Sequence, residues 1–314
     1  MVSKSSSSDV IESNKIREST TDGDLILGFL LALRAGGRQE KTLHIYEESI
    51  RMLSEYARSL GLPNLATLDR THVRHWLTSL HQKGNKPATV SVRYRSLSRF
   101  FNWCVEEDER EDNPMDRVDS PRIPDTIQAY YQPHEVEAVV KAINRATGHN
   151  LRDVAIVMTL YDSGVRAAEL CGMQVENLNL GEGTILVTGK AGKQRRVSFG
   201  QKTAQVIERY LRKRGAKSDW LWLGSGNKPM SVNGLRMMLQ RRFGDAGVKF
   251  NGAHAFRRAF AMEYLASGGQ EGDLKELGGW SNYAMVTRYA KANAGERAIA
   301  AHKKLSPGDR LNVG

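Results

Sequence analysis

The feature that most constrains this fold is a charged, proline-punctuated stretch in the first half of the chain. Residues 106–112 carry a dense run of charge, and Pro114, Pro121 and Pro124 follow within a few turns' length. Proline removes a backbone donor and clashes with the preceding turn, so no helix crosses this region. A chain of 314 residues is long enough for two separate cores. We therefore predict two domains joined by a linker at 113–126.

The segment before the linker is predicted to be a helical domain preceded by a tail. Residues 1–21 are polar and rich in serine, which is typical of a flexible tail. From there to the linker, apolar residues recur at intervals of three and four, and glycines stand where the periodicity ends. The first domain is assigned to residues 22–112, with helices expected at 24–33, 43–60, 71–82 and 87–105.

The second domain, residues 127–314, is predicted to be helical with a small β-sheet. Two short β-rich runs, 184–188 and 196–199, flank a glycine-rich basic turn at 189–193, which predicts a hairpin. The expected fold class is therefore mainly α with a small sheet, the second domain being of α+β type. Helices are predicted at 133–146, 151–161, 202–214, 231–246, 253–267, 272–279, 282–292 and 295–304.

Charge makes nucleic acid the first partner to consider. Lys and Arg outnumber Asp and Glu by 46 to 35, a net charge of +11 that attracts polyanions. The expected outer face of helix 87–105 carries Ser91, Arg93, Arg95 and Arg99, which could contact phosphates or base edges in the major groove of double-stranded DNA. A merely solvated face is the alternative interpretation of the same pattern.

Several other classes of protein are disfavoured. Cys104 and Cys171 lie in apolar helical contexts, which favours free thiols in a reducing, cytoplasmic compartment. No run approaches the roughly 18 apolar residues of a membrane span, and no apolar signal core is evident. The histidines and cysteines show no ligand spacing, so no metal is expected. The run 183–190 is not a P-loop, because five residues separate its glycines, and no cofactor is expected.

Two short motifs could carry chemistry. Arg166 follows a glycine turn, and Glu169 lies one helical turn further on the same face. His254 and Arg257 repeat this i, i+3 spacing on a later helix. Each pair alone is more often a surface ion pair or an ordinary helix pair than a functional site.

The order of a longer set of motifs is more specific. After the Arg-Glu pair come the basic hairpin turn with Lys190, the His-x-x-Arg motif, a Gly-Trp-Ser run with Trp280, and then Tyr289. Lys190 lies 24 residues after Arg166, and Tyr289 lies nine residues after Trp280. In order and spacing the set resembles the tyrosine recombinase (phage integrase) family of site-specific DNA recombinases. The resemblance covers most of the chain, although its specific motifs lie between residues 160 and 290.

This resemblance implies a role for each residue of the set. Arg166 and Arg257 would bind the scissile phosphate, Lys190 would protonate the leaving 5′ oxygen, and His254 would assist proton transfer. Tyr289 would attack phosphorus and form a 3′-phosphotyrosine link.

Two further residues complete the set. Glu169 would support Arg166. Trp280 stands where the family often has histidine, and its indole N–H can still donate to a phosphate oxygen.

Elementary chemistry supports these roles. Planar guanidinium groups offer fixed, multidentate stabilisation to a pentacoordinate phosphate, whose transition state carries more charge than the diester. Tyrosine has a pKa of about 10 and is almost wholly protonated at neutral pH. Neighbouring Arg166, Arg257 and His254 could lower the pKa of Tyr289. Covalent attack conserves the phosphodiester bond energy, so rejoining needs neither ATP nor metal.

The resemblance also implies an assembly. Two domains would close as a clamp around duplex DNA, and four protomers would act on two paired sites through a Holliday junction, with accessory DNA-bending or directionality proteins as further candidate partners. The segment 295–305 has a narrow apolar stripe and should dock on its own domain or on a neighbouring protomer. Two alternatives stay open: a type IB topoisomerase that relaxes DNA, and a DNA-binding regulator that keeps the fold without the reaction.

Overall fold

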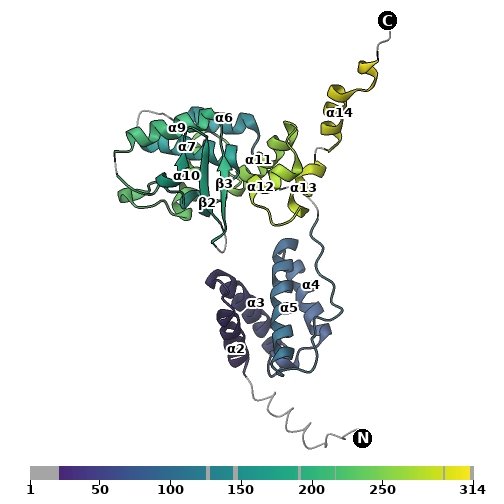
Figure 1. Cartoon of the computed structure of the whole chain (residues 1–314). Coiled ribbons are helices and arrows are strands. Elements are labelled where there is room, and N and C mark those ends of the chain that lie inside the picture. The colour runs from purple at the N-terminus through teal and green to yellow at the C-terminus, as the bar shows by residue number, and fades with distance from the viewer. Residues whose placement is uncertain are drawn as a thin grey trace, which may run out of the picture. The chain divides into compact units, whose positions relative to one another are not determined.

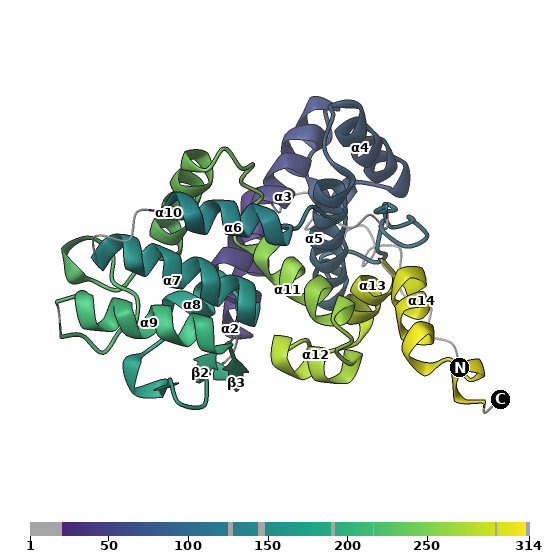
Figure 2. The same cartoon turned by 90° about the horizontal axis from the view of Figure 1, so that it is seen from above.

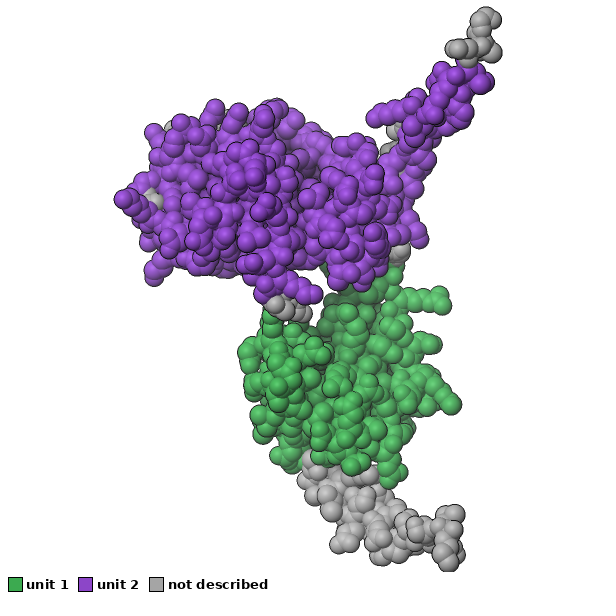
Figure 3. All heavy atoms as spheres, viewed as in Figure 1, with its two compact units in different colours: residues 1–125 green, residues 126–314 purple. Residues whose placement is uncertain are grey.

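The computed structural model contains two compact units, residues 1–125 and 126–314 (Figures 1 and 3). Each unit is described by itself. The predicted tail up to residue 20, the predicted catalytic Lys190 and part of the predicted linker lie outside the described residues. The structure describes residues 21–124, 128–143, 148–189, 192–215, 217–292 and 294–311.

Within residues 21–124, the first unit has four α-helices around one aromatic core. Thr21 caps the first helix in a capping box with Asp24, and Pro87 begins the fourth helix at its first turn, where a missing N–H costs nothing. The ring of Phe29 packs edge-on against Phe100, with centroids 5.4 Å apart. The helices are α2 (Asp22–Ala35), α3 (Glu40–Ser59), α4 (Arg70–Gln82) and α5 (Pro87–Glu106).

The packed core of the first unit continues into the segment where the sequence predicted a linker. Met115 and Val118 are buried in the same apolar cluster as the helices. The hydroxyl of Tyr94 donates to the Val118 carbonyl at 2.8 Å. The chain therefore stays bound to the first unit beyond residue 112.

The second unit is mainly helical with a three-stranded antiparallel sheet in the order β1-β2-β3. β2 and β3 form the predicted hairpin, with Thr188 opposite Gln194 at its turn end. The edge strand β1 was not predicted, because two residues give no detectable alternation. The fold class predicted from sequence is confirmed. The elements are α6 (Pro133–Ala142), α7 (Gly148–Ser163), α8 (Ala167–Cys171), β1 (Leu178–Asn179), β2 (Thr184–Thr188), β3 (Gln194–Ser198), α9 (Gln201–Lys213), α10 (Val232–Asp245), α11 (His254–Ala266), α12 (Glu271–Gly278), α13 (Ala284–Ala292) and α14 (Ala294–Leu305).

Helix α7 is central to the second unit, packing against α6, α9 and α11 (Figure 2). Its N-terminal half also carries a buried ion cluster. Asp153 has no exposed surface, and its carboxylate accepts hydrogen bonds from Arg152 at 2.7 and 2.9 Å and from Arg242 of α10 at 2.8 Å. The same guanidinium groups donate to the Leu223 carbonyl and the Asn150 amide oxygen. This cluster joins α7 to α10.

The chain enters the second unit along helix α11. Arg258 donates two hydrogen bonds to the Ala129 carbonyl, at 2.6 and 2.9 Å, and one to the side-chain oxygen of Gln128. The hydroxyl of Tyr131 accepts from the Asn251 backbone N–H at 2.8 Å, just before α11. Residues 128–131 are thereby fastened to the start of this helix.

A smaller apolar cluster forms where α11, α12 and α13 meet. Phe260, Leu274 and Val286 contribute one side chain from each helix, and Tyr289 is buried among them. Helix α14 follows α13 (Figure 1). Its Ile299 and Leu305 side chains are exposed. Within the part of the chain that the structure describes, no helix has the length and apolarity to cross a bilayer.

Candidate active site

The first motif occupies the turn between α7 and α8. Gly164 has a φ of +60°, and a Cβ there would collide with the ring of Phe260, so only glycine fits. The turn brings Arg166 to the start of α8, where its backbone N–H and Nη1 donate to the two Glu169 carboxylate oxygens at 2.8 and 2.7 Å. The Arg166 side chain remains 43% exposed, whereas that of Glu169 is 2% exposed. A buried carboxylate thus holds a guanidinium that still faces solvent.

Arg257 approaches the same turn from α11 but is buried, with 1% of its surface exposed. Its Nη1 donates to the Gly164 carbonyl at 2.8 Å and its Nη2 to the Gly278 carbonyl at 2.6 Å. The guanidinium carbon lies 4.0 Å from the ring centroid of Trp280, in a cation–π arrangement. Arg257 therefore joins the turn before Arg166 to the turn before Trp280.

Sequence reasoning did not assign Arg195, which also lies in this site. It donates to both Glu169 oxygens, at 2.7 and 2.8 Å, and its Nε donates to the Leu277 carbonyl at 3.2 Å. One signal could have identified it. In β3 it shares a face with the buried Val197, so alternation directs this arginine inward.

Trp280 and Tyr289 complete the group. Their ring centroids are 5.9 Å apart with planes inclined at 58°. Burial raises the pKa of Tyr289, and the opposing effect of the Arg257, Arg258 and Arg288 charges does not outweigh it. The charge of Arg257 thus lowers the tyrosine pKa as predicted, but the net shift is upward because only 3% of the residue is exposed.

His254 is the first residue of α11 and keeps an exposed edge. Partial desolvation of its imidazole, together with the positive charges of Arg258, Arg257 and Arg166, lowers the pKa of His254 below 6.5. The imidazole is therefore neutral at pH 7 and able to accept a proton.

The charges of the site do not balance. Burial would raise the pKa of Glu169, but hydrogen bonds from Arg195 and Arg166 lower it to about 2, so this carboxylate is ionised at neutral pH. Burial and the charges of Arg166 and Arg195 lower the pKa of Arg257 to about 9, so it too remains charged. Three charged guanidinium groups thus lie near one carboxylate, and two of them pair with it. An anion such as a phosphodiester would relieve the excess positive charge.

The predicted DNA-contacting face of α5 is only partly exposed. Ser91 is buried, which corrects its assignment to the outer face. Arg93 is turned toward α3, where its Nη1 donates to the Glu48 carboxylate at 2.9 Å and to the Ser49 hydroxyl. The other two positions differ in their partners: Arg99 pairs with Glu106, and Arg95 is exposed with its Nε donating to the Ser91 carbonyl.

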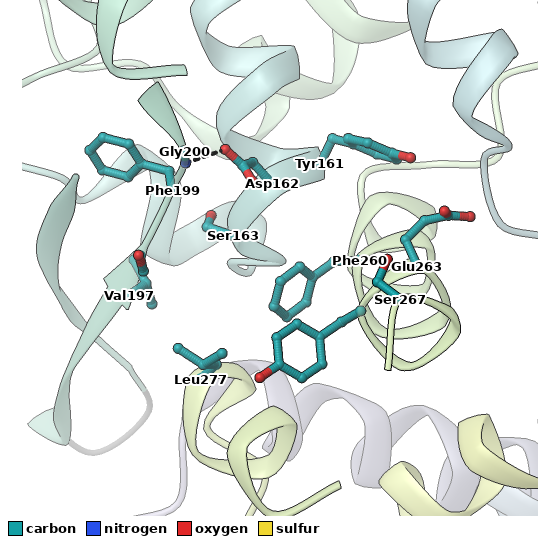
Figure 4. Close-up of a pocket in the computed structure, with 12 residues that line it drawn as sticks. Tyr161, Asp162, Ser163, Val197, Phe199, Gly200, Phe260, Glu263, Ser267 and Leu277 are labelled. Atoms are coloured by element: carbon teal, nitrogen blue, oxygen red, sulfur yellow. Dashed lines mark hydrogen bonds between the residues drawn. The ribbon is translucent and has the colours of Figure 1, made fainter. Parts of the chain in front are cut away.

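One neighbouring cavity contains none of the predicted site residues. A cavity of about 390 Å³ opens between α7, β3 and α11, lined by Asp162, Phe199 and Phe260 among others (Figure 4). In this cavity, the Asp162 carboxylate accepts a hydrogen bond from the Gly200 N–H at 2.7 Å. This contact positions the start of α9 and involves no predicted site residue. Across the described ranges, no three His, Cys, Asp or Glu side chains gather as metal ligands would.

Comparison with known proteins identifies the family. Residues 130–296 match the Phage integrase family, and residues 26–108 match the N-terminal SAM-like domain of phage integrases. The chain belongs to the phage integrase family, which confirms the resemblance seen in its motifs. A tyrosine recombinase XerC from Halalkalibacterium halodurans is 26% identical over 276 residues, covering 84% of this chain and 91% of that protein. A tyrosine recombinase XerC from Escherichia coli O157:H7 is 29% identical over 262 residues, covering 79% and 84%.

Solved structures share the fold. The integrase of transposon Tn1549, in complex with transposon right-end DNA, superposes with a TM-score of 0.75 at 19% identity, covering 91% of this chain and 100% of that one. The XerH site-specific recombinase, in a post-cleavage complex with a palindromic difH substrate, gives a TM-score of 0.73 at 18% identity, covering 95% and 89%.

Proposed function

We propose that this protein is a site-specific recombinase that cleaves and rejoins double-stranded DNA through a 3′-phosphotyrosine intermediate. The observation that carries the proposal is the convergence of Arg166, Arg257, Trp280 and Tyr289 on one site with excess positive charge. The similarity of the chain to tyrosine recombinases along most of its length supports the same function. These similarities do not favour the topoisomerase or the silent regulator.

The reaction is a pair of transesterifications. The Tyr289 oxygen attacks the scissile phosphorus, the bond to the 5′ oxygen breaks, and that oxygen takes a proton. Attack by a 5′ hydroxyl then breaks the phosphotyrosine bond and returns the proton to the tyrosine. One phosphodiester is exchanged for another at each step, so no external energy source is consumed.

Each residue is assigned the part that its chemistry fits. Arg166 and Arg257 stabilise the developing charge on the phosphate oxygens. His254, neutral at pH 7, accepts the proton of Tyr289, whose raised pKa makes such a base necessary. Trp280 donates its indole N–H to phosphate, and Lys190 protonates the leaving oxygen. Because only 3% of Tyr289 is exposed, its side chain must become exposed before it attacks DNA.

The variant Tyr289→Phe tests the proposal. We expect it to bind DNA with nearly wild-type affinity and to form no covalent adduct, because only the nucleophilic oxygen is lost. Suicide duplexes tiled from the DNA that flanks the gene, analysed on denaturing gels, would reveal the adduct. Adducts that persist in the variant would contradict the assignment, and Tyr283→Phe is the matched control because Tyr283 is the neighbouring exposed tyrosine.

We also propose that the two units close around duplex DNA and that four protomers assemble on two paired sites, acting at the nucleoid if the host is bacterial. Helix α14 supports assembly, because a short helix with exposed Ile299 and Leu305 gains stability from a partner surface. A chain ending at Asn293 should bind single sites but fail to form the paired complex in analytical ultracentrifugation. A truncated protein that assembles and recombines normally would eliminate this role.

A further inference from the structure

Strand β3 carries two adjacent arginines in very different surroundings. Arg196 is 70% exposed and comes no closer than 3.7 Å to its partner Glu182. Arg195 points to the other face, is 15% exposed, and donates to both oxygens of the buried Glu169. Bidentate pairing of this kind fixes orientation as well as charge.

The guanidinium of Arg195 also reaches a third segment. Its Nε donates to the Leu277 carbonyl at the end of α12. Close by, Gly279 has a φ of +61°, and a Cβ there would lie 2.8 Å from the Arg195 Cδ. One side chain thus joins β3, α8 and the turn after α12, segments that lie far apart in the sequence.

Both phosphate-binding candidates depend on the atoms that Arg195 holds. The Glu169 carboxylate orients Arg166 by accepting hydrogen bonds from the backbone N–H and the side-chain Nη1 of Arg166. The turn after α12 supplies the Gly279 carbonyl to Arg166, at 3.3 Å, and the Gly278 carbonyl to Arg257. Without Arg195, the buried Glu169 carboxylate would lose two of its hydrogen bonds, and the Leu277 carbonyl before the turn would lose its hydrogen bond from Nε.

From these contacts we infer that Arg195 is a positioning residue for strand cleavage. It holds Arg166 through Glu169 and holds Arg257 through the turn at Gly278, without itself contacting the scissile phosphate. The inference rests on the recombinase function proposed above and adds to it the residue that sets the geometry of the two arginines.

Single-turnover cleavage of a suicide duplex at saturating protein tests the inference. Arg195→Gln should slow cleavage by at least about tenfold, because small displacements of catalytic groups are costly. Its affinity for DNA should remain within about threefold of wild type, since the residue is not a phosphate ligand. Arg196→Gln is the matched control and should cleave within about twofold of wild type, as a surface substitution. Arg195→Lys should fall between them, because an ammonium cannot span two carboxylate oxygens and a carbonyl.

A substrate with a neutral methylphosphonate at the scissile position separates positioning from general stability. If Arg195 acts by placing the charges of Arg166 and Arg257, the fold-loss of Arg195→Gln should be smaller on the neutral substrate than on the phosphodiester. Equal losses on both substrates, or no loss on either, would overturn the inference. If Arg195→Gln does not fold, Arg195→Lys carries the same comparison. Absence of an adduct in the wild-type protein would instead contradict the proposed function.

Discussion

The second unit contains two arginine clusters built on the same plan, and they differ in the exposure of the arginines that hydrogen-bond the central carboxylate. In one, Asp153 is wholly buried and is hydrogen-bonded by Arg152 and Arg242, both largely buried, while the exposed Arg241 approaches it only to 3.9 Å. In the other, Glu169 is equally buried but binds Arg166, whose side chain is 43% exposed. The hydrogen bonds of the first cluster join two helices, whereas those of the second orient a guanidinium group that faces solvent. The exposure of the hydrogen-bonded guanidinium group, rather than the burial of the carboxylate, distinguishes the candidate active site from the structural cluster.

Asp153→Asn should give the largest effect and should act on stability. It leaves two buried guanidinium groups facing a neutral amide, and breaking a buried pair in this way costs about 4 kcal/mol of unfolding free energy. Urea denaturation followed by tryptophan fluorescence would measure this loss. The cleavage rate of the folded variant should stay close to wild type. A variant with normal stability and impaired cleavage would reverse the proposed difference between the clusters.

The single-turnover cleavage rate compares the two clusters through one variant in each, Arg166→Ala and Arg242→Ala. We expect Arg166→Ala to slow single-turnover cleavage by at least about a hundredfold, or about 2.7 kcal/mol, because it removes a preorganised transition-state contact. Arg242→Ala, assayed below its melting temperature, should change the rate by no more than about threefold, since its contacts are structural. Similar rates for the two variants would show that the exposed guanidinium is not used in catalysis.

The dependence of stability on acid pH tests the pairing of Glu169 in the second cluster. Glu169 has a pKa of about 2 in the folded chain against an ordinary value of 4.5. A depressed pKa stabilises the fold at pH values above 4.5, and this contribution is lost as pH falls toward 2. Between pH 5 and pH 3 we expect the wild type to lose about 2 kcal/mol more stability than Glu169→Gln. Equal losses in urea titrations at the two pH values would show that the pairing with Arg195 and Arg166 is weak.

The sequence predicted the fold class and most helices, because long amphipathic segments have an unmistakable period. It predicted Arg166, Glu169, Arg257 and Trp280 by motif, and these residues do lie together. What it could not predict was burial. A motif specifies which side chains are present, but the exposure of Arg257 depends on the Gly164 and Gly278 turns that close over it.

In the first unit, too, the sequence did not predict which side chains are buried. Its helices followed the predicted pattern, yet the exposed face assigned to α5 was partly wrong at Ser91 and Arg93. Small and charged residues on a helix wheel do not show whether a neighbouring helix covers them. Arg195 was missed for a different reason: the predicted strand began at Arg196, whereas β3 begins at Gln194, so the alternation was not extended to Arg195.

The attachment of residues 128–131 to α11 determines where the chain can be joined to that of a relative in a chimeric protein. Arg258 and Tyr131 bind the incoming chain to the helix that begins with His254. A chimera that exchanges the first unit should therefore keep its junction before Gln128, so that donor and recipient each retain a complete set of these contacts. A junction after Tyr131 would import a foreign segment beside the candidate active site. The modular boundary useful to an engineer thus lies on the N-terminal side of this attachment.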